Sequence, residues 1–385
     1  MKKRRLESEG LKNATSSLVA ILVGLLVGYI ILLISNPENA NEGLLTILKG
    51  GFNKGAKGMG QVLYFATPII CTGLSVGFAF KTGLFNIGAA GQLMIGGFVS
   101  VIVGITMPFL GPIHWVVALL AGMLAGAIWG LIPGVFKAYL NVNEVISSIM
   151  MNYIGMYLIN YLMKTLTAAD GSYLIYNNLK NQNISVAATA AIPKWGLDTL
   201  FSNMRGNYRD VSSVNGGIII AIVLAIIVYI VLNKTTFGYE LKACGYNKHA
   251  SNYAGINGNR SVVLSMVIAG ALAGAGGGLM YLAPASGLHI TVHEVLAPAG
   301  FNGISVALLG LSNPIAIIFS GIFISYITQG GVYLQSLKYM KEVIDIIIGI
   351  IIYFSAFSLF VKGVLSKWFA KKNDSLKDNS RGDDN

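Results

Sequence analysis

Few polar side chains in this sequence could contact a ligand inside its long apolar runs: Asn86, Gln92, Asn152, Glu294 and Asn302. Amide and carboxyl groups in such surroundings are costly unless they line a polar path or bond to one another. They can hydrogen-bond a neutral molecule, but they include no nucleophile–base pair and no metal-ligand set. We therefore expect neither a catalytic residue nor a metal site in this chain.

Two of these amides can act together only under one condition. Asn86 and Gln92 are six residues apart, which on a regular helix means about 9 Å along the axis and about 120° around it. Both can face one cavity only where Gly83 or Gly88 lets the helix begin late or unwind. Hydrogen bonding between helices explains the same two residues equally well.

The sequence contains no motif for using chemical energy. A G-x-x-x-x-G-K-[ST] phosphate loop is absent, so the chain is not expected to hydrolyse ATP. His289 and His293, four residues apart, are explained more simply as a polar rim than as a metal pair. Cys71 lies in an apolar run and Cys244 in a polar loop, so no disulfide is expected. We predict no cofactor in this chain.

Apolar helices must position these residues. Of the 385 residues, 54% are hydrophobic and only 11% are charged, against about 25% charged in a soluble domain. Apolar runs of roughly 17 to 25 residues recur along the chain, each long enough to cross a bilayer. The net charge of +11 includes basic clusters at the two ends, Lys2–Arg5 and the residues from Lys362 on. This is the positive-inside pattern of a membrane protein, and we expect no nucleic-acid binding.

Ten membrane spans fit the sequence, which predicts an all-α polytopic membrane protein with both termini in the cytoplasm. On this arrangement 17 of the 27 lysines and arginines lie on the cytoplasmic side. The first span resembles a signal peptide, but its length favours a retained helix. We expect a single transmembrane domain over 1–370 and a charged, disordered tail over 371–385. The predicted spans are 17–35, 61–80, 84–107, 113–133, 142–163, 216–233, 260–283, 289–310, 312–331 and 342–363.

Two connections and two glycine patterns stand out. Residues 164–215 are predicted to form a small cap outside the cell, and residues 234–259 an amphipathic ledge inside it. Glycine recurs every fourth residue from 122 to 134 and from 270 to 278, which predicts smooth helix faces that neighbours approach closely. We therefore interpret the GAGGG segment at 274–278 as packing rather than as a phosphate loop.

Ionisable side chains are scarce deep in the middle spans, whereas proton- or sodium-driven carriers usually need them there. This favours a neutral or weakly polar path for a small solute, with energy supplied from elsewhere. The alternative is a self-sufficient secondary transporter or channel for a small neutral solute, which would work alone in liposomes.

Four segments carry a family pattern: GLFNIGAAGQLMIGG at 83–97, NEVISSIMMNYI at 143–154, FGYELKACGYNKHASNYAGI at 237–256 and GFNGISVALLGLSNP at 300–314. In this order they resemble the permease subunits of ABC importers for ribose-type sugars, branched-chain amino acids and nucleosides. The first two are most similar to the nucleoside branch. The resemblance implies a permease that translocates a nucleoside, or a simple sugar, by alternating access. Ala90 stands where the family commonly has an acidic residue, so the resemblance gives little support for a charged contact at this position.

The resemblance also implies roles for single residues. Residues 234–259 correspond to the loop that couples the permease to its ATPase, and the matching positions are Gly238, Glu240, Ala243, Gly245 and Gly255. The helices at 84–107 and 289–310 would move around the translocation path, whose candidate polar residues are Asn86, Gln92, Glu294 and Asn302. Asn143 and Glu144, at an inner helix start, fit either helix capping or a cytoplasmic gate.

A permease of this kind works in an assembly. The resemblance implies a second homologous permease subunit, a cytoplasmic ABC ATPase that carries the ATP and Mg²⁺, and an external substrate-binding lipoprotein that captures the small-molecule solute. The chain would lie in the lipid bilayer of the bacterial cytoplasmic (inner) membrane as a multi-pass protein.

Overall fold

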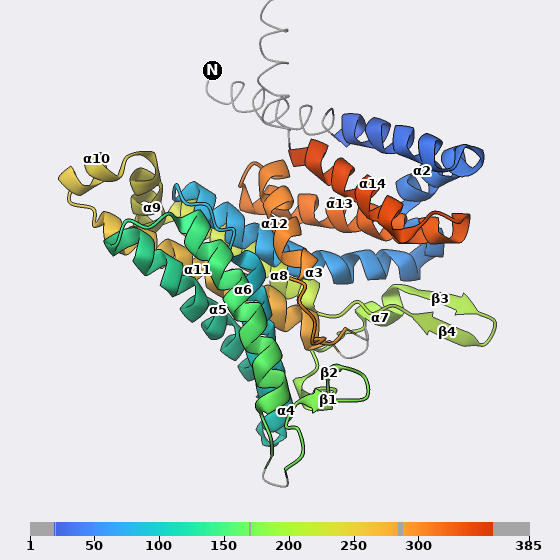
Figure 1. The fold of residues 1–385 in the computed structure, drawn as a ribbon, viewed down its shortest axis with the longest axis horizontal. Helices are drawn as coiled ribbons and strands as arrows, with labels where there is room; N and C mark the ends of the chain where they lie inside the picture. The colour runs from blue at the N-terminus through green and yellow to red at the C-terminus, as the bar shows by residue number, and fades with distance from the viewer. Residues whose placement is uncertain (1–18, 20, 169–170, 284–287, 357–385) are drawn as a thin grey trace, which may run out of the picture. The chain divides into compact units, whose positions relative to one another are not determined.

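The computed structural model describes residue 19 and residues 21–168, 171–283 and 288–356. This part of the chain is mostly helical, with two small two-stranded sheets (Figure 1). It belongs to two compact units, Lys49–Gly330 and a second unit of Met1–Leu48 with Gly331–Asn385. The tail 371–385 lies outside the described residues, and the single domain over 1–370 stays a prediction. In chain order the elements are a first helix Ile21–Ser35, η1 Pro37–Asn39, α2 Ala40–Lys49, η2 Gly50–Lys54, α3 Gly55–Lys81, α4 Ala89–Thr106, η3 Pro108–Ile113, α5 His114–Tyr139, α6 Glu144–Thr165, β1 Tyr176–Asn177, β2 Gln182–Asn183, η4 Ala188–Ala190, α7 Leu197–Leu200, β3 Ser202–Arg205, β4 Tyr208–Val211, α8 Gly217–Lys234, α9 Thr236–Tyr246, α10 Lys248–Tyr253, α11 Gly258–Tyr281, α12 Pro298–Leu309, α13 Pro314–Val332, η6 Tyr333–Leu337 and α14 Lys341–Ala356.

The helices confirm a polytopic membrane protein. In the described part of the chain, seven helical runs are long and apolar enough to cross a membrane. Two further apolar helices, Ile21–Ser35 and Pro298–Leu309, are shorter. The predicted span 342–363 is seen only in part, as α14. The count of ten spans and the cytoplasmic placement of both termini stay predictions.

The stretch 36–60 is not the loop that the ten-span arrangement implies. It is helical through α2 and the start of α3. In α2 the buried residues Ala40, Gly43 and Ile47 recur at three- and four-residue spacing, the period of a helix that covers one face. The polar residues between them obscured this period in the sequence.

The predicted span 289–310 is wrong in its first half. α12 begins at Pro298, because a proline suits the first turn of a helix and keeps the preceding Ala297 extended. Upstream, the chain pairs with β2 instead. The N–H of Asn183 donates to the Ile290 carbonyl (3.0 Å), and the N–H of Ile290 donates to Asn183 Oδ1 (2.7 Å).

Helices α5 and α11 meet along the two glycine stripes. A methyl group added at Gly126 would meet the carbonyl oxygen of Gly270, and one at Gly274 would meet that of Gly122. Backbones this close leave no room for side chains, so the predicted close approach of helices is confirmed. The GAGGG segment at 274–278 lies within α11, and its interpretation as packing is confirmed too.

The described residues between α6 and α8, 166–168 and 171–216, form a small cap with two antiparallel hairpins, β1–β2 and β3–β4. The second hairpin is attached to the first turn of α3. Lys57 Nζ pairs with Asp210 Oδ1 (2.6 Å), and Asn203 Nδ2 donates to the Lys54 carbonyl (2.6 Å). The cap therefore lies at the N-terminal end of α3.

The other unit packs its first helix against α14. A methyl group at Gly24 would lie 3.1 Å from the Ile351 backbone, and one at Gly28 would lie 3.3 Å from the Ile347 side chain. The Tyr339 hydroxyl donates to the Asn36 carbonyl (3.1 Å), which fixes the connection after the first helix.

Candidate functional site

The candidate path centres on residues 82–88, the turn between α3 and α4. Gly83 has a φ of +76°, which side chains other than glycine rarely allow. α4 begins only at Ala89. The late start that the two amides require is therefore present, and the predicted span 84–107 is wrong over residues 84–88.

Asn86 and Gln92 hydrogen-bond each other across this turn. Asn86 Nδ2 donates to Gln92 Oε1 (2.8 Å), and Gln92 Nε2 donates to Asn86 Oδ1 (3.2 Å). Asn86 Nδ2 also donates to Ser75 Oγ on α3 (3.0 Å). The two residues are 0% and 1% exposed, so in this conformation the pair is buried and satisfied from within.

A third amide, from α6, holds the start of α4. Asn152 Oδ1 accepts from the Gly91 N–H (2.8 Å), and its Nδ2 donates to the Ile87 carbonyl (3.1 Å). The first N–H groups of a helix lack partners inside the helix, and Gly88 at the N-cap has no side chain to supply one. Asn152 is one of the amides expected at membrane depth from the sequence, but it is not among the residues predicted to line the path. Its partners lie 61 and 65 residues away, and nothing in the local pattern of α6 points to them.

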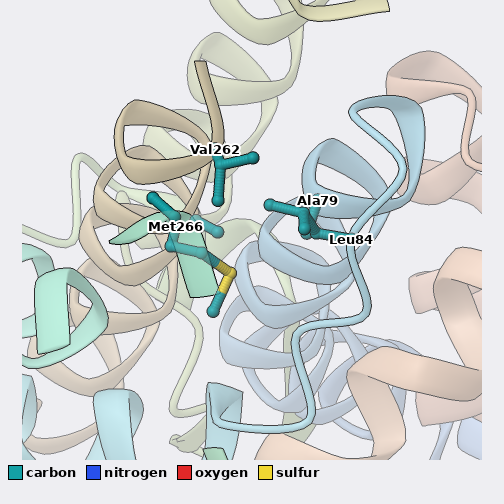
Figure 2. Packing of buried hydrophobic residues seen from close by; sticks show 6 residues of the cluster. Ala79, Leu84, Val262 and Met266 are labelled. Atoms are coloured by element: carbon teal, nitrogen blue, oxygen red, sulfur yellow. The ribbon is translucent and has the colours of Figure 1, made fainter. Parts of the chain in front are cut away.

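Apolar packing fixes the same turn from the side of α11. Leu84, within the turn, belongs to a buried cluster with residues of α3, α5 and α11. Figure 2 shows Val262 and Met266 on one helix facing Ala79 and Leu84. The turn therefore has an irregular backbone in well-packed surroundings.

Helix α12 contacts the turn region through its first residues. Gly300 abuts the backbone of Ala90 in α4, and Thr72 Oγ1 on α3 donates to the Ala299 carbonyl (2.9 Å). Of the remaining path candidates, Asn302 on α12 is half-buried and Glu294, before α12, is exposed. The structure thus joins Asn86 to Gln92 and leaves Glu294 outside their buried network.

Residues 234–259 form two short helices, α9 and α10, between α8 and α11. The chain breaks there because side chains cap three helix starts in succession. The caps are Thr235, Asn247 and Asn257, each accepting a hydrogen bond from the backbone N–H three residues later. Residues 234–259 are thus largely helical, as two short helices rather than one, and their placement inside the cell stays a prediction.

Two of the five coupling candidates make close backbone contacts. A methyl group at Gly238 would meet the carbonyl oxygen of Val231 in α8. One at Gly245 would lie 2.7 Å from the carbonyl carbon of Thr82 and 2.8 Å from the nitrogen of Gly83. α9 therefore touches the 82–88 turn directly, at the end of α3 opposite the cap (Figure 1).

The other three candidates lie toward the surface. Glu240 is exposed, Ala243 is half-buried, and both line a groove of about 880 Å³ formed by residues of α9 and α10. Tyr246, also in its lining, is 92% exposed. Gly255 has a φ of +84° with open space around it, so the backbone rather than crowding requires a glycine there. Burial raises the pKa of the Cys244 thiol in α9, against the opposing effect of Lys248.

The pair Asn143 and Glu144 is explained by local structure. Asn143 Oδ1 accepts from the Val145 N–H (2.8 Å) and caps α6. Glu144 pairs with Lys137 at the end of α5 (2.8 Å). These contacts support the capping interpretation of the two residues.

Comparison with known proteins agrees with this architecture. A sequence model of the family described as "Branched-chain amino acid transport system / permease component" matches residues 58–356, so the chain belongs to this family of membrane permeases. With its apolar helices, the chain is a multi-pass protein of the bacterial cytoplasmic (inner) membrane, and the predicted resemblance and localisation are confirmed.

The chain is similar to three permeases over most of its length. The guanosine ABC transporter permease protein NupP of Bacillus subtilis is 35% identical over 351 residues, 91% of this chain and 95% of that protein. The nucleoside ABC transporter permease protein NupB of Lactococcus lactis is 33% identical over 356 residues, 91% and 92% of the two chains. The glucose ABC transporter permease protein TsgB13 of Haloferax volcanii is 26% identical over 335 residues, 85% and 83%. No solved structure matches this chain.

Proposed function

We propose that this chain is the membrane-spanning permease subunit of an ATP-binding-cassette importer and translocates a nucleoside, with a simple sugar as the second candidate. The two relatives at 33% and 35% identity are named for guanosine and nucleoside transport, which supports the first substrate. A nucleoside is neutral and rich in hydroxyl and amide groups, so uncharged side chains such as Asn86 and Gln92 suit it.

The contact of α9 with the 82–88 turn carries this proposal. The backbone of Gly245 lies against Thr82 and Gly83, in the turn that contains Asn86. A displacement of α9 would therefore reach Asn86 and its partner Gln92 through adjoining backbone. Movement of an ATPase bound to the ledge would thus be transmitted to the path through a short series of contacts.

The path itself would open between α4 and α12. In the described conformation Asn86 and Gln92 satisfy each other. Withdrawal of Gly300 from Ala90 would uncover the pair, and solute hydroxyls would replace the bonds between the two amides. Asn302, on the same helix as Gly300, and Glu294, upstream of it, would then contact solute as it passes.

The proposed assembly has four parts. A second homologous permease would complete the path, and an external substrate-binding lipoprotein would deliver solute at the cap. A cytoplasmic ABC ATPase would bind the groove formed by α9 and α10 and carry the ATP and Mg²⁺. Exposed aromatic residues such as Tyr239 and Tyr246, 69% and 92% exposed, are typical of the centre of an interface.

Reconstitution tests the assignment. The chain would be placed in liposomes alone and together with a candidate ATPase, second permease and lipoprotein from the same organism, and uptake of radiolabelled guanosine, uridine and ribose would be measured. We expect ATP-dependent uptake by the complete set and none by the chain alone. Uptake by the chain alone would support the secondary transporter or channel instead.

A charge reversal tests the ledge. Glu240→Arg should leave the complex assembled, because the side chain is exposed, while lowering uptake at least about tenfold relative to ATP hydrolysis. Glu42→Arg, at an exposed position of α2, is the control and should transport normally. Normal transport by Glu240→Arg would contradict the role given to α9.

A further inference from the structure

A polar pocket of about 330 Å³ lies where α9 meets the ends of α3 and α8 and the start of α13. Two lysines line it, Lys81 at the end of α3 and Lys242 on α9. The side chains of Asn233, Tyr246 and Asn313 line it as well. All five can donate hydrogen bonds, so the pocket is suited to an acceptor.

Within the part of the chain that the structure describes, no carboxylate forms an ion pair with either lysine. The lining contains no Asp or Glu. The ion pairs of Lys57, Lys137 and Lys194 do not involve these two lysines. The contact that Lys242 Nζ makes is with an amide, Asn233 Oδ1, at 3.4 Å. Two unpaired ammonium groups in one pocket repel each other, and an anion between them would remove that repulsion.

The position of the pocket indicates the source of the anion. Lys81 ends one apolar span and Asn233 lies at the end of another, while Pro314 begins a third. The ends of membrane helices lie at the level of lipid headgroups. Phe80 and Leu232 line the same pocket, which places apolar surface beside the charged groups, as a headgroup joined to acyl chains requires. Basic pockets between membrane helices commonly bind phosphate headgroups.

We propose that this pocket binds a phosphate ester, and that its place at the ends of three spans selects the phosphodiester of an anionic phospholipid. Gly83 and Gly245 also line the pocket, so the bound headgroup spans the joint between the turn and α9. Occupancy would hold α9 against the turn. This last consequence rests on the proposed coupling role, whereas the binding itself does not.

Binding is measured on the full chain in nanodiscs and detergent, apart from any transport assay. Phosphatidylglycerol, phosphatidylcholine, inorganic phosphate and glycerol 3-phosphate are titrated, and the thermal unfolding midpoint and bound lipid by native mass spectrometry are recorded. We expect saturable binding of phosphatidylglycerol and not of phosphatidylcholine. The double variant Lys81→Gln/Lys242→Gln should bind it about tenfold or more weakly, without losing stability in neutral lipid.

The matched control is Lys234→Gln/Lys248→Gln, which removes the same charge from the same end of the molecule at positions outside the pocket lining. It should keep the affinity of the wild type. Equal losses in both double variants would reduce the effect to general surface charge and overturn the site, as would the absence of binding by every phosphate probe. Binding of the soluble phosphates alone would overturn the lipid assignment. If Lys81→Gln/Lys242→Gln lowers transport but leaves lipid binding unchanged, the two lysines act in coupling and the lipid site is overturned.

Discussion

At the scale of single residues, the Asn86–Gln92 pair determines what the 82–88 turn can do. Each side chain both donates to and accepts from the other, and Ser75 takes the second N–H of Asn86. A buried amide that loses its partner costs about 1–3 kcal/mol, whereas loss of both partners costs less than the sum. The contribution of each amide to stability therefore depends on whether the other amide is present.

Gln92→Leu should lower the free energy of unfolding by about 1–3 kcal/mol, because Asn86 Oδ1 then has no partner. The double variant Asn86→Leu/Gln92→Leu should be more stable than the two single effects added together. Thermal unfolding of the assembled complex measures this coupling. Gln329→Leu, a buried glutamine of α13 outside this network, is the control. Additive effects would mean that the two amides act independently.

The same variants separate packing from transport. If the pair belongs to the path, Gln92→Leu lowers uptake per assembled complex while capture of solute by the external lipoprotein is unchanged. Wild-type uptake would confine the pair to holding the bundle together, and the path would have to follow Glu294 and Asn302.

Sequence alone could predict part of this site. Residue type and apolar surroundings identified Asn86 and Gln92, and the 120° between them on a regular helix required a late helix start. The clamp by Asn152 could not be predicted, because it depends on how α6 lies against α4. The hydrogen bonds between Asn86 and Gln92 require the irregular backbone of residues 82–88. That backbone depends on Gly83 and on its close contact with Gly245, which lies far away in the sequence.

At the scale of elements, glycine spacing sets which helices touch. The stripes on α5 and α11 could be predicted because a four-residue period keeps glycine on one helix face. The helix over 40–49 could not be predicted, because polar residues hide its helical period. The extended stretch 290–292 could not be predicted either, because it is produced by pairing with a strand over 100 residues away.

The Gly126→Ala variant should give a much lower yield of assembled protein than the wild type. The added methyl group would meet the Gly270 carbonyl oxygen and lie 2.8 Å from the Gly274 Cα, so the two backbones must separate. Overpacking of this kind costs about 1–3 kcal/mol or more. Gly349→Ala is the matched control, because a methyl group there meets nothing within 4 Å and alanine is the better helix former. Size-exclusion yield and unfolding temperature decide between them, and equal behaviour would contradict the packing argument.

At the scale of the whole molecule, the cap and the ledge lie at opposite ends of α3. Lys57, in the first turn of that helix, pairs with the cap, and Thr82, just after its last turn, contacts Gly245 of α9. A helix of 27 residues is about 40 Å long, enough to cross a membrane. Cap and ledge must therefore face opposite compartments if α3 crosses the membrane.

Cysteine labelling tests which compartment each one faces. In a background of Cys71→Ala and Cys244→Ala, Met204→Cys on β3 should react with an impermeant maleimide added to intact cells. His249→Cys on α10 should react only after the membrane is opened. Met204 is 69% exposed and His249 is also exposed, so access is not limiting. The reverse pattern would put the ledge outside, where no ATPase could reach it.

The pairing of β2 with residues 290–292 has a consequence for the synthesis and folding of the protein on the ribosome. Asn183 and Ile290 are 107 residues apart, and a ribosome adds about 5–20 residues per second. The first hairpin must therefore wait roughly 5 to 20 seconds for its neighbouring strand, while α8 and α11 are being synthesised. During that interval its outer edge is an open template for other chains. Closure of the cap thus marks the moment when the helices through α11 have been made, and protease sensitivity near Asn183 in stalled nascent chains would report how far membrane insertion has advanced.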